Sequence, residues 1–380
     1  MQAVDVQLRT RALFGPGIID RVGAVARELG FRKTLLISDP GIVAAGHFAR
    51  AASLTRNEGI EVVGFHDFGE NPDTDAIDAG RRFAASRGFD SLIGLGGGSS
   101  MDCAKGINFL LTNGGTMSDY WGHGKASLPM LPMIGVPTTA GTGSEAQSYA
   151  LISDADTHIK MACGDPKAAF HTAILDAELT VTQPALVRAR AGYDAISHAV
   201  ETWVTTKCND ASAGFSREAA TLLFGAFERV LEHPEDVDAN GRMLLGAFYA
   251  GAAIEHSMLG AAHACANPLT IRHNTEHGAA VAHMLAHVVR WNGNECSAEY
   301  AALGEVAGLD GHVDGAAEAL ARRLEALAAT AGLSTRLRDV GVSRAELPEL
   351  AEDAAKQWTG KFNPRPFDAE GALEIYECAF

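Results

Sequence analysis

Hydrophobic and polar residues follow two alternating patterns along the first half of the chain. Short apolar runs typical of buried strands lie at Lys33–Ser38, Ile60–Phe65, Ser91–Leu95 and Met133–Val136. Stretches with apolar residues at helical spacing lie around and between them, at Gly17–Leu29, His47–Glu58, Asp73–Arg87 and Met101–Thr112. Parallel βαβ units produce this alternation. We therefore predict a doubly wound, Rossmann-like α/β domain over residues 1–180.

The pattern changes after Asp176, where the strand-like runs stop. From Pro184 onward the chain is rich in Ala, Leu and Glu at helical spacing, which predicts an all-α domain over residues 181–380. Proline lacks a backbone N–H and clashes with the preceding helical turn, so three Xaa-Pro pairs are expected to break these helices. The pairs are His233-Pro234, Asn267-Pro268 and Asn363-Pro364. The predicted fold class is thus α/β followed by all-α.

The composition indicates a folded protein with a large core and narrows its partners. Of 380 residues, 47% are hydrophobic and 21% are charged, as in ordinary globular chains. The excess of 47 acidic over 31 basic residues gives a net charge of −16, so we do not expect nucleic acid as a partner. No window approaches the ~18 unbroken apolar residues of a membrane span, and the N-terminus lacks the apolar core of a signal peptide. Six scattered cysteines without a CxxC pair complete the expectation of a cytoplasmic protein that is not bound to membranes.

Two glycine-rich loops follow predicted strands. Gly96-Gly97-Gly98-Ser99 comes directly after Ser91–Leu95 and precedes a helical stretch. Such a loop lets backbone N–H groups approach a phosphate, and the helix dipole adds attraction, although a tight turn requires the same glycines. The second loop, Pro137–Ala146, fits GxGxxA, but that pattern alone is a weak signal. The ordinary dinucleotide fingerprint is not met, because no acidic residue closes a strand some ~20 residues later.

Asp39 ends the strand-like run Lys33–Ser38, upstream of both loops. A carboxylate at this place could accept hydrogen bonds from a ribose and repel a 2′-phosphate. Its position alone favours the simpler interpretation of an Asp-Pro turn.

Aspartate and histidine residues in the second half offer ligands for a metal. Asp194 and His198 are four residues apart in a helical segment and so share one helix face, although a surface contact has the same spacing. His263 lies within the small-residue stretch Gly260–Pro268, either as a satisfied core group or as a ligand, and His277 opens a further apolar helix. Three imidazoles and one carboxylate would make a mixed N/O site of the kind that Fe²⁺, Zn²⁺ or Mn²⁺ uses.

Spacing alone does not select these ligands. A competing set of imidazoles, two of them also four residues apart, consists of His256, His273, His283 and His287. Cys208 and Cys265 have no partner at motif spacing, so we expect both to be buried thiols.

Taken together, these segments resemble the iron-containing (group III) alcohol dehydrogenase family. The matching pieces, in family order, are Gly96–Lys105, Pro137–Glu145, Asp194–Glu201, Gly260–Pro268 and His277-Gly278 followed by His287. The resemblance implies hydride transfer between NAD(H) and a small alcohol or aldehyde, with Fe²⁺, or alternatively Zn²⁺, acting as a Lewis acid on the substrate oxygen. It also selects the metal ligands over the competing set: Asp194, His198, His263 and His277.

The resemblance further assigns residues to the cofactor and to catalysis. The cofactor-binding set is Asp39, Gly96, Gly97, Gly98, Ser99, Asp102, Thr138, Thr139, Thr142 and Lys160. Asp39 falls where the family often places a carboxylate that favours NAD over NADP, whereas solvation explains a surface Lys160 equally well. Family members commonly have a second histidine four residues after the ligand that matches His263, but here the residue is Asn267. Because an amide cannot carry a proton at neutral pH, Asn267 would only orient substrate or cofactor, and His273 is a candidate proton route.

Alternatives to a metal-dependent alcohol dehydrogenase remain open at this point. One is a zinc-dependent polyol dehydrogenase or a lyase of the dehydroquinate synthase type in the same fold, and the other is a non-catalytic nucleotide-binding regulator. Four matched ligands argue against the regulator. We expect a symmetric homo-oligomer, most simply a dimer.

Overall fold

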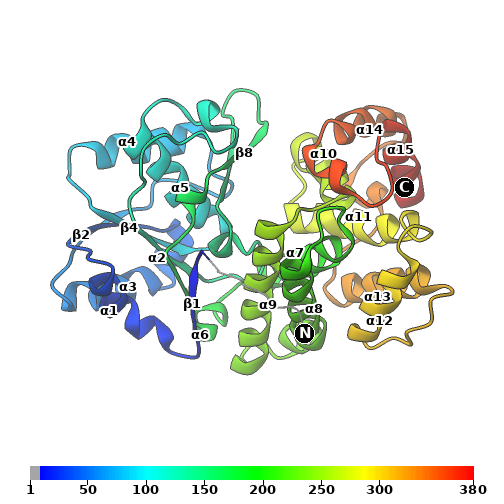
Figure 1. Cartoon of the computed structure of the whole chain (residues 1–380), viewed down its shortest axis with the longest axis horizontal. Coiled ribbons are helices and arrows are strands. Elements are labelled where there is room, and N and C mark those ends of the chain that lie inside the picture. The colour runs from blue at the N-terminus through cyan, green and yellow to red at the C-terminus, as the bar shows by residue number, and fades with distance from the viewer. Residues whose placement is uncertain (1–8) are drawn as a thin grey trace. The chain divides into compact units, whose positions relative to one another are not determined.

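A computed structural model describes residues 9–380, which form two compact units (Figure 1). The first unit comprises the described residues up to 139 together with 143–183, and the second comprises 140–142 and 184–380. Strands belong to the first unit and long helices fill the second. The predicted fold class, α/β followed by all-α, is confirmed.

A parallel six-stranded sheet forms the centre of the first unit, in the order β1-β9-β6-β4-β2-β3. A smaller three-stranded sheet has the order β5-β8-β7. The strands are β1 (Arg11–Phe14), β2 (Lys33–Ile37), β3 (Glu61–Phe65), β4 (Ser91–Gly96), β5 (Gly122–His123), β6 (Met133–Pro137), β7 (Tyr149–Ser153), β8 (Lys160–Gly164) and β9 (Thr172–Leu175). The four strands expected from apolar runs are β2, β3, β4 and β6.

Helices cover both faces of the six-stranded sheet, because successive residues of its strands point to opposite sides. In β2, Leu35 and Ile37 join one buried cluster, which includes Ile107 of α5. Leu36, between them, joins the other cluster, which includes Val25 of α1. The helices of this unit are α1 (Val22–Glu28), α2 (Pro40–Ala44), α3 (His47–Asn57), α4 (Thr74–Ala85), α5 (Gly98–Asn113) and α6 (Ala177–Thr180).

Parallel pairing brings the candidate cofactor loops to one edge of the sheet. β4 pairs with β2 on one side and with β6 on the other, all in parallel. The residues that follow these three strands, including Asp39, the glycine loop and Thr138, therefore lie at the same carboxyl edge. Ligands of open α/β sheets bind at this edge.

The helical unit is built around α7, which packs against α8, α9 and α11. α10 packs against both α11 and α14. The helices are α7 (Ala185–Val204), α8 (Asp210–Glu232), α9 (Val237–His256), α10 (Ala261–His273), α11 (His277–Trp291), α12 (Ser297–Val306), α13 (Ala316–Thr330), α14 (Leu347–Ala355) and α15 (Ala369–Ala379). Among the helices of residues 9–380, none is both long and apolar enough to cross a membrane.

Two local predictions are wrong. Asn267-Pro268 does not break a helix, because α10 continues through the buried Pro268 to His273. Proline removes one helical hydrogen bond at a cost of about 3 kcal/mol, which the packing of α10 against its neighbours offsets. Cys265 is buried as expected, but Cys208 is exposed, since it lies in the connection between α7 and α8.

Candidate active site

α7 positions three acidic or imidazole side chains on one face. Asp194, His198 and Glu201 follow one another at intervals of four and three residues, the spacing of neighbours on a helix surface. All three are buried, with at most 4% of each residue exposed. A helix that buries polar groups on the face toward its neighbours requires partners for them there.

Two further histidines come from α10 and α11, which both approach α7. His263 lies in the first turn of α10, and His277 is the first residue of α11. Gly278 permits this approach, since a Cβ atom there would lie 2.4 Å from the backbone oxygen of Arg190 on α7. Only a residue without a side chain fits between these two helices.

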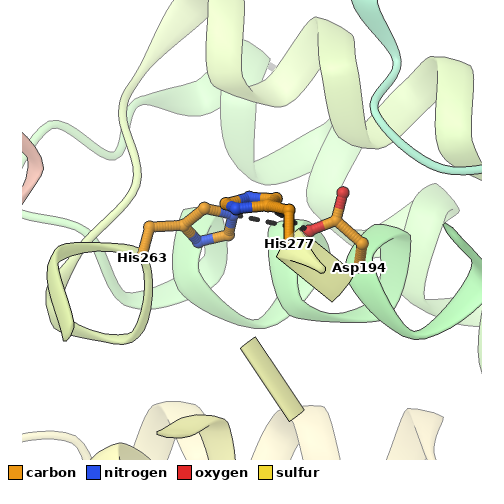
Figure 2. A group of neighbouring side chains, drawn as sticks. All are labelled: Asp194, His263 and His277. Atoms are coloured by element: carbon orange, nitrogen blue, oxygen red, sulfur yellow. Dashed lines mark ion pairs between the residues drawn. The ribbon is translucent and has the colours of Figure 1, made fainter. Parts of the chain in front are cut away.

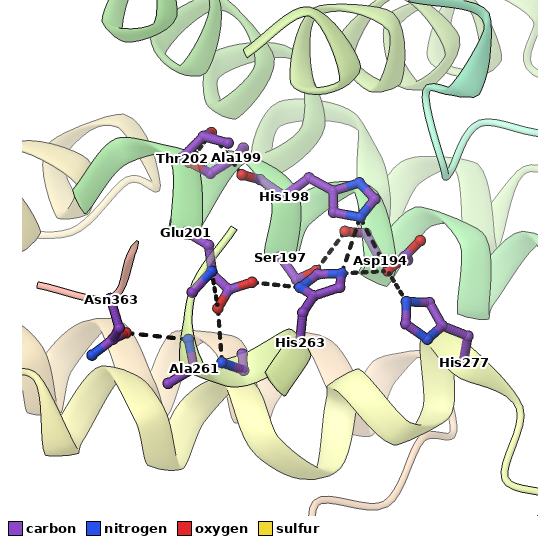
Figure 3. A network of polar contacts seen from close by, with 12 residues as sticks. Asp194, Ser197, His198, Ala199, Glu201, Thr202, Ala261, His263, His277 and Asn363 are labelled. Carbon is purple, nitrogen blue, oxygen red and sulfur yellow. Dashed lines mark hydrogen bonds and ion pairs between the residues drawn. The ribbon is translucent and has the colours of Figure 1, made fainter. Parts of the chain in front are cut away.

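The Oδ1 atom of Asp194 faces three imidazoles (Figure 3), of which Figure 2 shows those of His263 and His277. Its distance is 3.5 Å to Nε2 of His198, 3.6 Å to Nε2 of His263 and 3.8 Å to Nε2 of His277. The Nε2 atoms of His198 and His263 are 3.1 Å apart. Asp194 Oδ1 is buried and accepts no hydrogen bond from any described residue.

The charges of this cluster are strongly coupled. Burial raises the pKa of Asp194, but the neighbouring His198, His263 and His277 outweigh burial and hold that pKa below its usual range. For His263, burial lowers the pKa, but the carboxylates of Glu201 and Asp194 outweigh burial and raise the pKa to about 9. A positive charge is therefore favoured at this point.

The donor set fits a divalent metal ion. A buried carboxylate oxygen without a hydrogen-bond donor and imidazole nitrogens that face one another are mixed N/O ligands for Fe²⁺ or Zn²⁺. Among residues 9–380, one group of three or more such side chains has ligand atoms that converge, all within 4.8 Å of one another: Asp194, His263 and His277. His198 lies beside two of these three atoms.

The competing histidines do not converge. His256 Nδ1 is 2.8 Å from the backbone oxygen of Ala252 in its own helix. His287 Nε2 is 3.2 Å from the backbone oxygen of Thr335, whereas both ring nitrogens of the buried His283 have no partner among the described residues. His273 ends α10, ten residues and about 15 Å along the helix from His263, and pairs there with a carboxylate of Glu346 at 3.4 Å. The structure thus does not bring His273 to the converging side chains around Asp194.

The first glycine loop connects β4 directly to α5. Gly96 has a φ of +144°, and a Cβ atom there would lie 2.4 Å from Ser100 Oγ, so glycine is required. Gly97 precedes α5 and offers no side chain as a cap. The first N–H groups of α5, beginning at Gly98 and Ser99, are therefore oriented as in an anion-binding helix terminus.

Asp39 forms the turn that its sequence position suggested and lies beside the glycine loop. It caps α2, since its Oδ1 accepts a hydrogen bond from the backbone N–H of Ile42 at 3.1 Å. Its Oδ2 accepts a hydrogen bond from Ser100 Oγ at 3.1 Å, and a Cβ atom on Gly96 would lie 3.0 Å from it. The carboxylate thus lies against the glycine loop.

Asp102 belongs to a buried polar network that joins α5 to the second loop. Its Oδ1 accepts a hydrogen bond from Ser144 Oγ at 2.7 Å and lies 3.9 Å from Lys105 Nζ. Lys105 is fully buried and donates to the backbone oxygens of Ser144 and Tyr149, both at 2.7 Å. Sequence reasoning assigned no role to Lys105, although a lysine on the apolar face of a predicted helix was a signal for one.

The other predicted cofactor residues are spread more widely. Thr138 is buried and its backbone N–H donates to Gly96 at 2.9 Å, while Thr139 lies against Gly97. Lys160 begins β8 and its Nζ donates to Asn71 Oδ1 at 3.3 Å. Thr142 groups by its contacts with the helical unit.

Comparison with known proteins places the whole of this architecture in one family. Residues 9–177 match the family described as iron-containing alcohol dehydrogenase, and residues 188–380 match the C-terminal domain of the Fe-containing alcohol dehydrogenase family. The chain belongs to the iron-containing alcohol dehydrogenase family. As a member of that family it is an oxidoreductase acting on alcohols or aldehydes, as the sequence predicted.

The similarity to individual members of this family covers almost the entire chain. Alcohol dehydrogenase 4 of Schizosaccharomyces pombe is 33% identical over 93% of this chain and 83% of its own length. NAD-dependent methanol dehydrogenase of Bacillus methanolicus is 28% identical over 97% of each chain. A crystal structure of 1,3-propanediol oxidoreductase superposes with a TM-score of 0.94, at 29% identity over 100% of each chain.

Asn267, where this member departs from the family pattern, lies one helical turn after His263 on α10. Its Nδ2 atom donates a hydrogen bond to Gln357 Oε1 at 3.0 Å. The amide is half-buried and is held by a neutral partner. The arrangement is consistent with an orienting residue rather than a proton carrier.

Sequence reasoning missed the contact of Glu201 with His263. The glutamate ends one of the segments that match the family, but no role was predicted for its carboxylate. In the structure it touches Nδ1 of His263. Its position seven residues after Asp194 on the same helix face was the available signal.

Proposed function

We propose that this enzyme interconverts a small alcohol and its aldehyde with NAD(H), using a divalent metal held by Asp194, His198, His263 and His277. The single observation that supports it most is the buried Oδ1 atom of Asp194, which lacks a hydrogen-bond partner and faces three imidazole nitrogens. We propose Fe²⁺ as the native ion, as in the family to which the chain belongs. Zn²⁺ is the alternative, because it generally binds such ligands more tightly and the supply of each ion in the cell decides which one is bound.

When bound, the ion supplies a Lewis acid that stabilises negative charge on the substrate oxygen. The protein contributes the ligands and their surroundings. Burial of Asp194, His198 and His263 keeps water from competing for the ion and strengthens each electrostatic interaction. Asn267, one turn from His263, would orient substrate or cofactor through its amide.

NAD(H) would bind at the carboxyl edge of the parallel sheet. The first N–H groups of α5, at Gly98 and Ser99, are suited to the pyrophosphate, and Asp39 at the adjoining strand end is suited to ribose hydroxyls. The name of the Bacillus methanolicus relative, NAD-dependent methanol dehydrogenase, supports this cofactor. The proposal retains the expected small alcohol or aldehyde substrate, the cytoplasmic location and the dimer.

The metal assignment is tested with His277→Ala and the control His287→Ala. Both histidines lie on α11, but His287 is outside the converging cluster. After anaerobic reconstitution with Fe²⁺, we expect His277→Ala to lose most of its bound iron and its alcohol-dependent NADH formation, because a three-ligand remnant binds poorly. The control should keep both.

Full iron occupancy in His277→Ala would contradict the ligand assignment. Absorbance of NADH over a panel of small alcohols and aldehydes distinguishes the remaining alternatives. A lyase would consume its substrate without net change in that absorbance, and a nucleotide-binding regulator would show no turnover with any substrate of the panel.

A further inference from the structure

Glu201 contacts the metal cluster from the side of His263 that faces away from Asp194 (Figure 3). Its carboxylate is buried, with 4% of the side chain exposed. Oε2 forms a short contact with Nδ1 of His263. Oε1 accepts two backbone hydrogen bonds, from Gly260 at 3.1 Å and from Ala262 at 2.7 Å. Both oxygens of the carboxylate are therefore occupied by N–H donors.

The backbone donors stand at the beginning of α10, where a helix leaves its first N–H groups without partners inside the helix. Gly260, the residue before α10, has no side chain to cap them. The carboxylate of Glu201 reaches across from α7 and takes this role, and the helix dipole stabilises its negative charge. A Cβ atom on Gly260 would lie only 3.1 Å from Glu201 Oε1, so the glycine leaves room for the carboxylate.

We infer that Glu201 fixes the tautomer of His263 and thereby sets how tightly the enzyme holds its metal ion. A carboxylate only accepts hydrogen bonds, so Nδ1 of His263 must carry the hydrogen. Nε2 then presents its lone pair toward Asp194 and His198, where the ion would bind. Glu201 is thus a positioning residue, and its role rests on the proposed metal site.

Only a carboxylate satisfies all three donors at once. Glutamine at position 201 would have a single acceptor oxygen. If that oxygen accepted from Gly260 and Ala262, the amide N–H would point at His263 Nδ1 and favour the tautomer in which Nε2 carries the hydrogen and cannot bind a metal. If the oxygen instead faced His263, the amide N–H would oppose the two backbone N–H groups.

The experiment compares Glu201→Gln with the native enzyme and with Glu218→Gln, a control on the exposed face of α8. Each protein is loaded with Co²⁺, and release of the ion to a chelator is followed by its visible absorption. We expect Glu201→Gln to bind Co²⁺ about 10–100-fold more weakly, as is typical when a hydrogen-bond partner of a metal-binding histidine is removed. Its visible spectrum should also change, because His263 no longer presents the same nitrogen. A purely structural role would lower thermal stability without altering the spectrum of the loaded protein.

Co²⁺ affinity and spectrum in Glu201→Gln that equal those of the native protein would overturn the inference alone. Absence of Co²⁺ binding by the native protein would overturn the proposed function and this inference with it. If Glu201→Gln does not fold, Glu201→Asp replaces it, since the shorter side chain keeps the charge but withdraws the carboxylate from Nδ1 of His263. Faster Co²⁺ release from Glu201→Asp supports the inference, and unchanged release overturns it.

Discussion

Two buried carboxylates, Asp194 and Glu201, surround the imidazole of His263 from opposite sides. Their combined charge of about −2 would balance one divalent cation among neutral imidazoles. This balance matters because an unpaired charge in a buried site costs several kcal/mol. The same carboxylates raise the pKa of His263 to about 9 despite its burial, so without an ion a proton is the charge that this position favours. Metal binding and proton release are therefore linked at His263.

Replacing Asp39 by Asn tests the cofactor preference at a single residue. Asparagine caps helices about as well as aspartate, so Asp39→Asn should keep the contact with Ile42 while removing the charge. A 2′-phosphate near the native carboxylate would be repelled by its like charge, at a cost of about 1 to 4 kcal/mol. We expect the variant to narrow the ratio of kcat/KM for NAD over NADP at an unchanged Tm. Equal efficiency of the native enzyme with both cofactors would assign Asp39 to the helix cap alone.

Asn267 should contribute only modestly to the rate of catalysis. Its hydrogen bond to Gln357 is neutral, and loss of one such bond costs about 0.5–1.5 kcal/mol, whereas loss of an acid–base group lowers rates about 10²–10⁴-fold. We expect Asn267→Ala to reduce kcat about tenfold or less. Turnover measured against pH for the native enzyme, Asn267→Ala and Asn267→His checks this. A fall of several orders of magnitude in Asn267→Ala with metal still bound would show a catalytic role.

At the scale of elements, the position of α11 against α7 decides whether His277 reaches Asp194. A Cβ atom on Gly278 would lie 2.4 Å from the backbone oxygen of Arg190, so Gly278→Ala must push the two helices apart. We expect a loss of about 1–3 kcal/mol in the free energy of unfolding, together with weaker metal binding. Urea titration and metal analysis measure both effects.

The matched control for this helix contact is Gly225→Ala on α8. A Cβ atom at Gly225 would meet nothing within 4 Å, so the substitution should stabilise the helix by about 0.5–1 kcal/mol and leave metal binding unchanged. Gly278→Ala with native stability and native metal content would show that α11 can approach α7 without the glycine.

The elements differ in how far the sequence could predict them. Four strands could be predicted because each contains a short, mostly apolar run that pairs in parallel with its neighbours. The continuation of α10 through Pro268 could not be predicted, because it depends on packing against other helices rather than on the local sequence. The same limit applies to the site. Spacing could not separate His277 from His287, since hydrogen bonds and helix approach decide which ring nitrogens converge.

At the scale of the whole molecule, the residues proposed to bind the metal and those proposed to bind NAD(H) belong to different units. The four proposed metal-binding residues lie within 184–380, whereas nine of the ten proposed cofactor residues, all except Thr142, lie within the α/β unit. Each unit also has buried residues of its own around its sheet or its central helix α7. Binding of either ligand should therefore stabilise mainly the unit that supplies its contacts.

Hydrogen exchange with and without metal tests this division. A free metal concentration of 100 times Kd stabilises the metal-binding state by about 2.7 kcal/mol. Amide hydrogen exchange should then slow about 100-fold in segments that open only when the metal site is lost. We expect chelation to accelerate exchange in α7, α10 and α11, since they contain the ligands, and to leave β4 and β6 unchanged. NAD⁺ added to the metal-free enzyme should instead protect the beginning of α5. Metal-dependent protection spread evenly over both units would contradict the separation, because it would require the two units to open together.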